Sequence, residues 1–79
     1  MIVPLTTREG KLLTGIEVFA IEYLGDRTSL ISLTFRGKKH LEKILDDNHI
    51  QHWETKDCQY FYGIEIDSKY ISHDNILRL

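Results

Sequence analysis

The residues best suited to chemistry in this chain form one basic run, Arg36-Gly37-Lys38-Lys39-His40. We expect this run to lie where a strand passes into a helix, and free backbone N–H groups at such a start can hold a phosphate or a carboxylate. The run lacks the G-x-x-x-x-G-K-[ST] and G-x-G-x-x-G patterns of known nucleotide-binding loops. We therefore interpret Arg36, Lys38, Lys39 and His40 as a local anion-binding or partner-binding site. The plainer alternative is a solvated charged face.

The charges of the expected helix run against its dipole. Basic residues crowd its start, whereas Asp46 and Asp47 lie at its end, and a helix is partially positive at its N-terminus and negative at its C-terminus. Each misplaced exposed charge costs about 0.3–1 kcal/mol, which a bound anion or an acidic partner would offset. We expect that replacing Lys38 and Lys39 with Glu slightly stabilises the isolated fold.

Histidine and cysteine side chains suggest two further chemistries. His49, His52 and Cys58 could supply ligands to zinc, but a structural zinc site needs four ligands, and the two histidines would lie on opposite faces of a strand. Cys58 beside a histidine could act as a nucleophile, yet its alternation places it on the core face, where a thiol is inert. We predict no metal site, no cofactor and no catalytic residue.

Two carboxylates, Glu65 and Asp67, share one face of a predicted strand. Paired carboxylates can bind metal or divide acid and base roles, but an acidic outer face is the commoner arrangement on an antiparallel strand. A chain this short also has little material for a substrate cleft. We therefore predict that the protein is not an enzyme.

Aromatic residues are concentrated between Trp53 and Tyr62. Alternation along a strand sets Phe61 on the opposite face from Tyr60 and Tyr62. If the helix packs on the tyrosine face, Phe61, with Trp53 or Phe19, forms exposed apolar surface of the kind found at protein interfaces. The alternative is that the helix and the N-terminal segment cover both faces. We interpret Trp53 and Phe61 as candidate partner-interface residues.

The elements that would position these residues follow from the hydrophobic pattern. Residues 1–12 form an extended segment in which Pro4 favours an edge position, and residues 16–24 form a central strand covered on both faces. A turn at 25–27 leads to an alternating strand over 28–35. Apolar residues at helical spacing then predict a helix from Gly37 to Asn48. Residues 50–54 and 58–67 predict a second hairpin, and the segment after residue 68 supplies a short edge strand.

This order, β-β-β-α-β-β, predicts a small single-domain α+β fold over residues 1–79. We expect an antiparallel sheet of about five strands with one α-helix packed on a face. Because a chain of 79 residues has a small core, a dimer or a partner that covers apolar surface would stabilise it.

Overall charge separates the remaining classes of function. Twelve acidic and ten basic residues give a formal net charge of −2, which provides no global attraction to nucleic acid or to an anionic membrane. No apolar run approaches the length of a membrane-spanning helix, and a sole cysteine fits the reducing cytoplasm. We predict a cytoplasmic accessory or regulatory protein that binds a protein partner or a second copy of itself. The alternatives are nucleic-acid or anion binding through the basic run, and a small Cys/His metal protein or enzyme.

Overall fold

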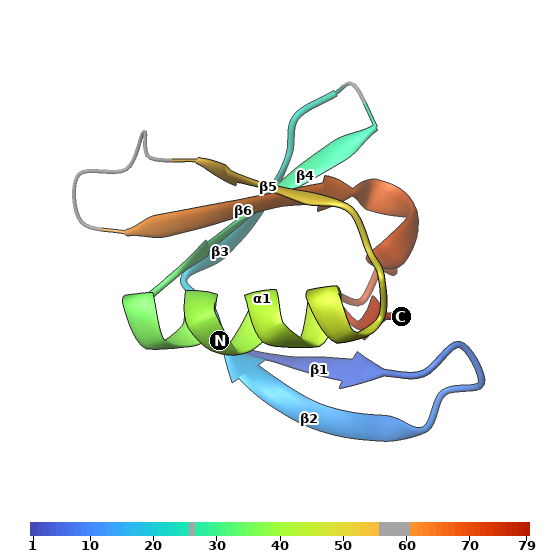
Figure 1. The fold of residues 1–79 in the computed structure, drawn as a ribbon. Coiled ribbons are helices and arrows are strands. Elements are labelled where there is room, and N and C mark those ends of the chain that lie inside the picture. The colour runs from blue at the N-terminus through green and yellow to red at the C-terminus, as the bar shows by residue number, and fades with distance from the viewer. Residues whose placement is uncertain (26, 56–60) are drawn as a thin grey trace.

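The computed structural model describes residues 1–25, 27–55 and 61–79, which form one α-helix, a 3-10 turn and two sheets (Figure 1). The elements in chain order are β1 (Ile2–Thr6), β2 (Leu12–Glu17), β3 (Ala20–Tyr23), β4 (Thr28–Leu33), α1 (Phe35–Asp47), β5 (His52–Thr55), β6 (Tyr62–Asp67), η1 (Ser68–Tyr70) and β7 (Leu77–Arg78). One sheet has the strand order β2-β1-β7 and the other β3-β4-β6-β5. The predicted α+β class is confirmed, with seven strands divided between two mostly antiparallel sheets.

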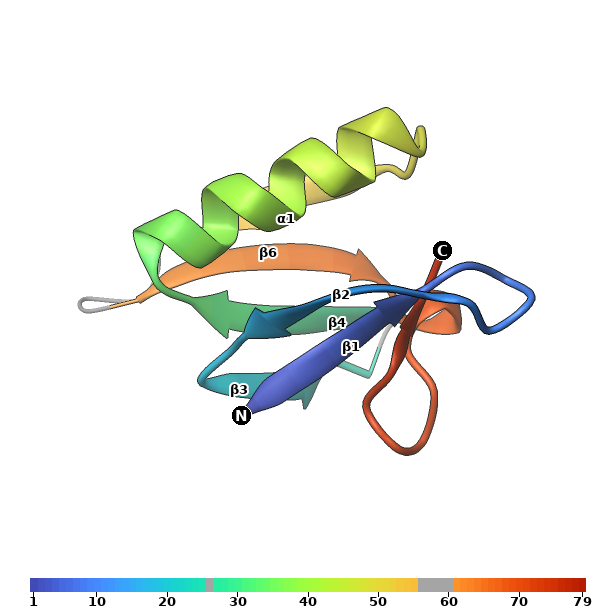
Figure 2. The same ribbon diagram turned by 90° about the horizontal axis from the view of Figure 1, so that it is seen from below.

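Helix α1 and the three-stranded sheet lie on the same side of the four-stranded sheet (Figure 1, Figure 2). Both sheets and the helix contribute buried apolar side chains to one core, which consists of Val3, Leu5, Ile16, Val18, Ile31, Leu33, Leu41, Leu45, Ile50, Ile64, Ile66 and Leu77. No helix or strand in the described ranges lies on the other side of the four-stranded sheet. We call that uncovered side the outer face.

The apolar run at residues 16–24 is not one central strand, so that prediction is wrong. β2 and β3 divide the run, and each is an edge strand of its own sheet. The chain changes sheet at two adjacent residues: the N–H of Val18 donates to the carbonyl of Met1 at 2.8 Å, and the N–H of Phe19 donates to the carbonyl of Ser32 at 2.8 Å. The run consists largely of β-branched, aliphatic and aromatic residues and contains no glycine or proline. The sequence therefore gives no signal of this break.

The N-terminal segment contributes β1, which is the middle strand of the three-stranded sheet. Pro4 lies opposite Gly15 of β2, whereas β7 pairs with β1 at Leu5 and Thr6. The predicted edge position is therefore wrong for β1 as a strand, although at Pro4 itself β1 has a paired neighbour on one side only, where a proline without an N–H is tolerated.

Helix α1 begins two residues before the predicted start, because Thr34 caps it. The hydroxyl of Thr34 accepts the N–H of Gly37 at 3.1 Å, which is the usual role of a threonine at this position. The helix ends before Asn48, as predicted, and the side-chain amide of Asn48 donates to the carbonyl of Ile44 at 2.8 Å. The first turn contains no acidic residue and the last turn no basic one, so the reversed charge order is present.

Both predicted hairpins are present. β3 pairs with β4, β5 pairs with β6, and the pairing of β4 with β6 joins the two hairpins. The predicted strand positions Cys58 and Tyr60 lie outside the described residues. The predicted final edge strand is β7, which pairs in parallel with β1 and thereby joins the two ends of the described fold.

Candidate functional site

The structure does not bring the predicted anion-binding groups at the start of α1 together as one open site. Gly37 lies inside the helix, and the N–H groups of Gly37 and Lys38 both donate to Thr34, at 3.1 and 2.8 Å. These two backbone groups are therefore not open to an anion, contrary to the prediction from the sequence. The other three side chains of the set are exposed: Arg36, Lys39 and His40.

Lys38 is held between two carboxylates of its own fold. Its Nζ lies 2.8 Å from Oε1 of Glu54 on β5 and 3.1 Å from Oε1 of Glu42 on α1, and its side chain is only 11% exposed. The hydrogen bond to Glu54 raises the pKa of Lys38 above its ordinary value; partial burial works against this shift, and Glu42 adds to it. The ammonium group thus joins the helix to the sheet and is not free for an external anion.

His49 and His52 lie in different surroundings. His52 Nδ1 lies 2.8 Å from the carbonyl oxygen of Ile50, and its Nε2 lies 3.5 Å from a carboxylate oxygen of Asp46. His49 is exposed just after the helix, with a φ of 56°. Cys58 lies outside the described residues. Within the ranges that the structure describes, no group of three or more His, Cys, Asp or Glu residues is placed to hold a metal ion.

Asp67 and Glu65 lie on the outer face, two residues apart as the sequence predicted. Asp67 Oδ1 accepts the N–H of Lys69 at 2.9 Å and caps η1, which gives this carboxylate a structural role. Glu65 lies between Leu30 and Trp53 in the strand pairing. It is therefore part of the surface that Trp53 helps to form.

The outer face is defined by the strand register. Cross-strand partners share a face, and the buried Ile31 pairs with the buried Ile64, so that row points to the core. The alternate positions of the four strands form the outer face: Ala20, Glu22, Thr28, Leu30, Ser32, Trp53, Thr55, Gly63, Glu65 and Asp67.

Exposed aromatic side chains lie on this surface, at Trp53, and at the end of the sheet where β3 and β6 begin. Trp53 is 46% exposed, and Phe61, just before β6, is 39% exposed. The ring of Phe61 lies 4.4 Å from the ring of Phe19, which is 49% exposed. Tyr62, the next residue after Phe61, instead lies 5.3 Å from the ring of Phe35 on the helix side. Phe61 and Tyr62 thus contact different partners, in keeping with the alternation expected from the sequence.

The charge of the outer face has one sign. None of the strands β3, β4, β5 and β6, all of them described, contains Lys or Arg, whereas Glu22, Glu65 and Asp67 lie among the outer-face positions. Glu54, the remaining carboxylate of these strands, faces α1 and pairs with Lys38. The outer face therefore combines aromatic and acidic side chains.

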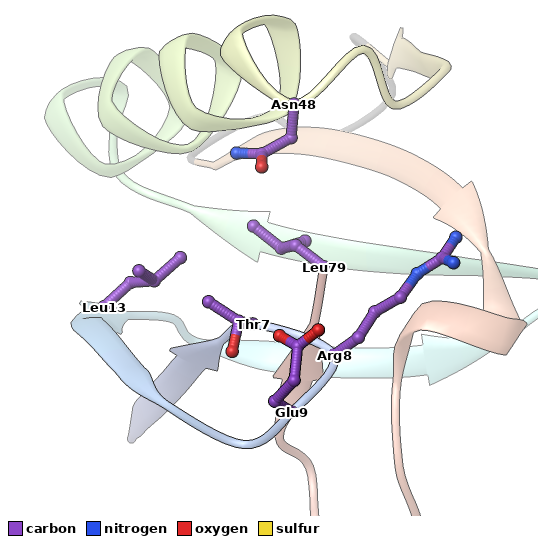
Figure 3. Close-up of a pocket in the computed structure, with 6 residues that line it drawn as sticks. All are labelled: Thr7, Arg8, Glu9, Leu13, Asn48 and Leu79. Atoms are coloured by element: carbon purple, nitrogen blue, oxygen red, sulfur yellow. The ribbon is translucent and has the colours of Figure 1, made fainter.

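A pocket of about 240 Å³ lies between the C-terminal end of α1 and the β1–β2 turn (Figure 3). Its lining is chemically mixed and consists of Thr7, Arg8, Glu9, Leu13, Asn48 and Leu79. Figure 3 shows the Arg8 side chain running away from Leu13, so that its guanidinium group does not point into the centre of this pocket. The hydroxyl group of the lining, that of Thr7, accepts the N–H of Lys11 at 3.1 Å and so helps to close the β1–β2 turn.

A larger hollow of about 430 Å³ is lined by Ile21, Tyr23, Ser29, Ser68, Ile71, Ser72, His73 and Asn75. Serine beside histidine is the combination required for nucleophilic catalysis. However, the hydroxyl of Ser29 bonds to that of Ser68 at 2.7 Å, and the hydroxyl of Ser72 donates to Asp74. These three hydroxyl groups are therefore engaged with groups other than the imidazole of His73.

The chain matches no family model, no curated protein and no solved structure. In the described part of the chain, α1 is too short and too polar to cross a bilayer.

Proposed function

We propose that this chain is a small cytoplasmic accessory protein without catalytic activity, and that it acts by binding another protein through its outer face. The observation that carries the proposal is the exposure of Trp53 on a sheet face that no described element covers, together with the exposed ring pair of Phe19 and Phe61 at the end of that sheet where β3 and β6 begin. Aromatic residues are enriched at the centres of protein interfaces, where they contribute much of the binding energy.

The charge of the outer face determines the kind of partner. A partner with basic residues around an apolar groove would complement Glu22, Glu65 and Asp67 electrostatically. A two-fold contact between two copies would instead set these carboxylates against themselves, and the same charges repel nucleic-acid phosphates. A different, basic protein is therefore the partner that this surface fits best. The sole cysteine, Cys58, supports the reducing setting proposed for this interaction.

Site-specific photo-cross-linking in cells tests this proposal. A photoreactive phenylalanine analogue replaces Trp53 or Phe61 in one pair of variants, and Leu12, which is 65% exposed on the other sheet, in a control variant. We expect one discrete protein adduct from the first two positions and none from Leu12, with the adduct identified by mass spectrometry.

Charge and self-association provide two further readouts. Glu65→Lys should weaken the cross-link, because it reverses a charge beside Trp53, whereas Glu9→Lys on the distant turn should not. The proposal fails if Trp53 and Phe61 yield no discrete adduct, or if they yield the same adducts as Leu12. An adduct of twice the mass of the chain would replace the proposed partner with a second copy.

A further inference from the structure

A second group of cations lies where the β1–β2 turn, η1 and β7 meet. An open pocket of about 300 Å³ between these elements is lined by Arg8, Lys69, Tyr70 and Arg78. Three of its four lining residues carry permanent positive charges, and none of them belongs to the basic run on α1. A volume near 300 Å³ is at the small end of ligand pockets.

The fold brings these residues together from distant parts of the chain. Parallel pairing sets Arg78 beside Thr6, and the N–H of Leu79 donates to the carbonyl of Thr6 at 2.8 Å. Arg8 follows on the turn, which is closed by the bond from the N–H of Thr7 to the carbonyl of Lys11 at 2.9 Å.

The opposite wall of the pocket is formed by η1. Asp67 bonds the backbone N–H of Lys69, and Tyr70 is half-buried and packs against the core. The Nζ of Lys69 lies 5.2 Å from the centroid of the Tyr70 ring. The pocket therefore has one wall fixed by the core and one fixed by the β1–β7 pairing.

The three cations lack the neutralisation that Lys38 receives. Within the described ranges, no carboxylate forms an ion pair with Arg8, Lys69 or Arg78. The nearby carboxylates have other positions or partners: Glu9 lines the adjacent pocket, Asp67 caps η1, and Asp74 accepts a hydrogen bond from Ser72, although the charge of Arg78 also acts on it.

We propose that this pocket binds the phosphate group of a small phosphorylated ligand. Two guanidinium groups can each donate paired hydrogen bonds to phosphate oxygens, and a lysine adds a mobile point charge. Tyr70 also lines the pocket, and its side chain carries a hydroxyl group of the kind that donates hydrogen bonds to phosphate oxygens. The pocket shares no lining residue with the outer face, so this proposal is tested independently of the proposed protein partner.

The test is a titration of the ¹⁵N-labelled chain with inorganic phosphate and with pyrophosphate, followed by amide chemical shifts. Sodium chloride at the same ionic strength serves as the reference. We expect saturable shifts in the turn that carries Arg8, in η1 and in β7, with pyrophosphate binding more tightly than phosphate. Binding should weaken at higher salt, because the three cations are exposed.

Single charge deletions assign the site. Arg8→Gln and Arg78→Gln should each weaken pyrophosphate binding by about tenfold, the loss expected for a charge-assisted contact. Lys43→Gln, on the exposed side of α1, should leave binding unchanged. The three substituted side chains, those of Arg8, Lys43 and Arg78, are exposed. The amide spectrum of each variant reports whether the fold is retained.

Three outcomes would overturn the inference. The first is shifts no larger than those caused by chloride. The second is equal weakening by Lys43→Gln and Arg78→Gln. The third is binding of a single-stranded oligonucleotide at these residues more tightly than pyrophosphate, because it would make the pocket part of a nucleic-acid surface.

Discussion

Lys38 illustrates how a residue that looks like a ligand-binding cation can be part of the fold. Oε1 of Glu42 is buried and makes no well-aligned hydrogen bond, so it depends on the charge of Lys38, 3.1 Å away. Glu54 shares the same ammonium group from β5. Removing the cation would leave one buried carboxylate oxygen without compensation.

We predict that Lys38→Met lowers the free energy of unfolding by about 1–2 kcal/mol, since a partly buried ion pair loses one partner. The matched control is Lys43→Met. The Lys43 Nζ lies 3.5 Å from Asp47, but both side chains are exposed, so the expected loss is about 0–0.5 kcal/mol. Urea unfolding of the two variants and of the unmodified chain measures both values. Equal losses would contradict the structural role of Lys38.

The pH dependence of this difference has a definite sign. The pKa of Lys38 is raised in the folded state above the unfolded value of 10.5, so the folded state holds this proton more tightly than the unfolded state. The stabilisation is fully present below pH 10.5 and is lost as the pH rises through the folded-state pKa. We expect the stability difference between the unmodified chain and Lys38→Met to be constant near neutral pH and to shrink above pH 10.5. A difference that is already lost at neutral pH would contradict this assignment.

From the helix dipole alone, replacement of Lys38 or Lys39 by Glu is expected to stabilise the fold. The contacts of Lys38 make the expected effects at these two positions different. At Lys39, which is exposed with its Nζ 5.4 Å from the Phe35 ring, replacement by Glu should still stabilise the helix slightly. At Lys38, replacement by Glu would place a third carboxylate beside Glu42 and Glu54, so the expected sign reverses. The sequence reveals the charge order but not the residue on β5 that faces it.

Strand β6 depends on a glycine for its fit between β4 and β5. A Cβ atom at Gly63 would lie 2.2 Å from Cγ2 of Thr55 and 2.9 Å from Cδ1 of Leu30. Both neighbours must therefore shift if any other residue occupies this position. This close approach cannot be foreseen from the sequence, because it arises only once β4 and β5 flank β6.

We predict that Gly63→Ala lowers the free energy of unfolding by about 1–3 kcal/mol, the usual effect of overpacking. Thr55→Ser removes the atom that would clash, so the double variant should recover part of the loss. A double-mutant cycle measured by thermal unfolding isolates this coupling. If the two effects simply add, the contact between Gly63 and Thr55 is not the cause.

Hairpins and the helix were predictable because their signals are local. The turn at 25–27, the helical spacing of Leu41, Ile44 and Leu45, and the stop at Asn48 need only neighbouring residues. The break at Val18 and Phe19 was not predictable, because it is set by hydrogen bonds to Met1 and Ser32. The pocket of Arg8, Lys69 and Arg78 was not predictable either, because these residues come together only through the long-range pairing of β1 with β7.

Acidic and basic side chains gather at different places on the molecule, which the composition does not show. A formal net charge of −2 suggests an evenly mixed surface, but the outer face carries acidic and aromatic side chains, whereas the pocket beside η1 carries three cations. The two proposed sites thus differ in charge and in the ligands they would attract.

Trp53 reports the charge of the outer face, because it is the only tryptophan in the chain. We predict that Glu65→Gln raises the ratio of iodide to caesium quenching of its fluorescence about twofold. One unit charge about 7 Å away in water acts on an ion with an energy near RT, and screening at about 0.15 M salt reduces this energy by roughly half. Glu9→Gln should leave the ratio unchanged. An unchanged ratio in Glu65→Gln would contradict the proposed acidic surroundings of Trp53.

The pairing of β1 with β7 also affects the order in which parts of the chain fold. Leu5 pairs with Leu77, so almost the whole described chain forms the loop that this contact closes, whereas each hairpin of the four-stranded sheet closes a short one. Long loops lose more entropy on closure and slow folding. On a ribosome, the β3–β4 and β5–β6 hairpins can form while β1 still lacks β7. We therefore expect the cationic pocket, which needs β7, to be assembled last.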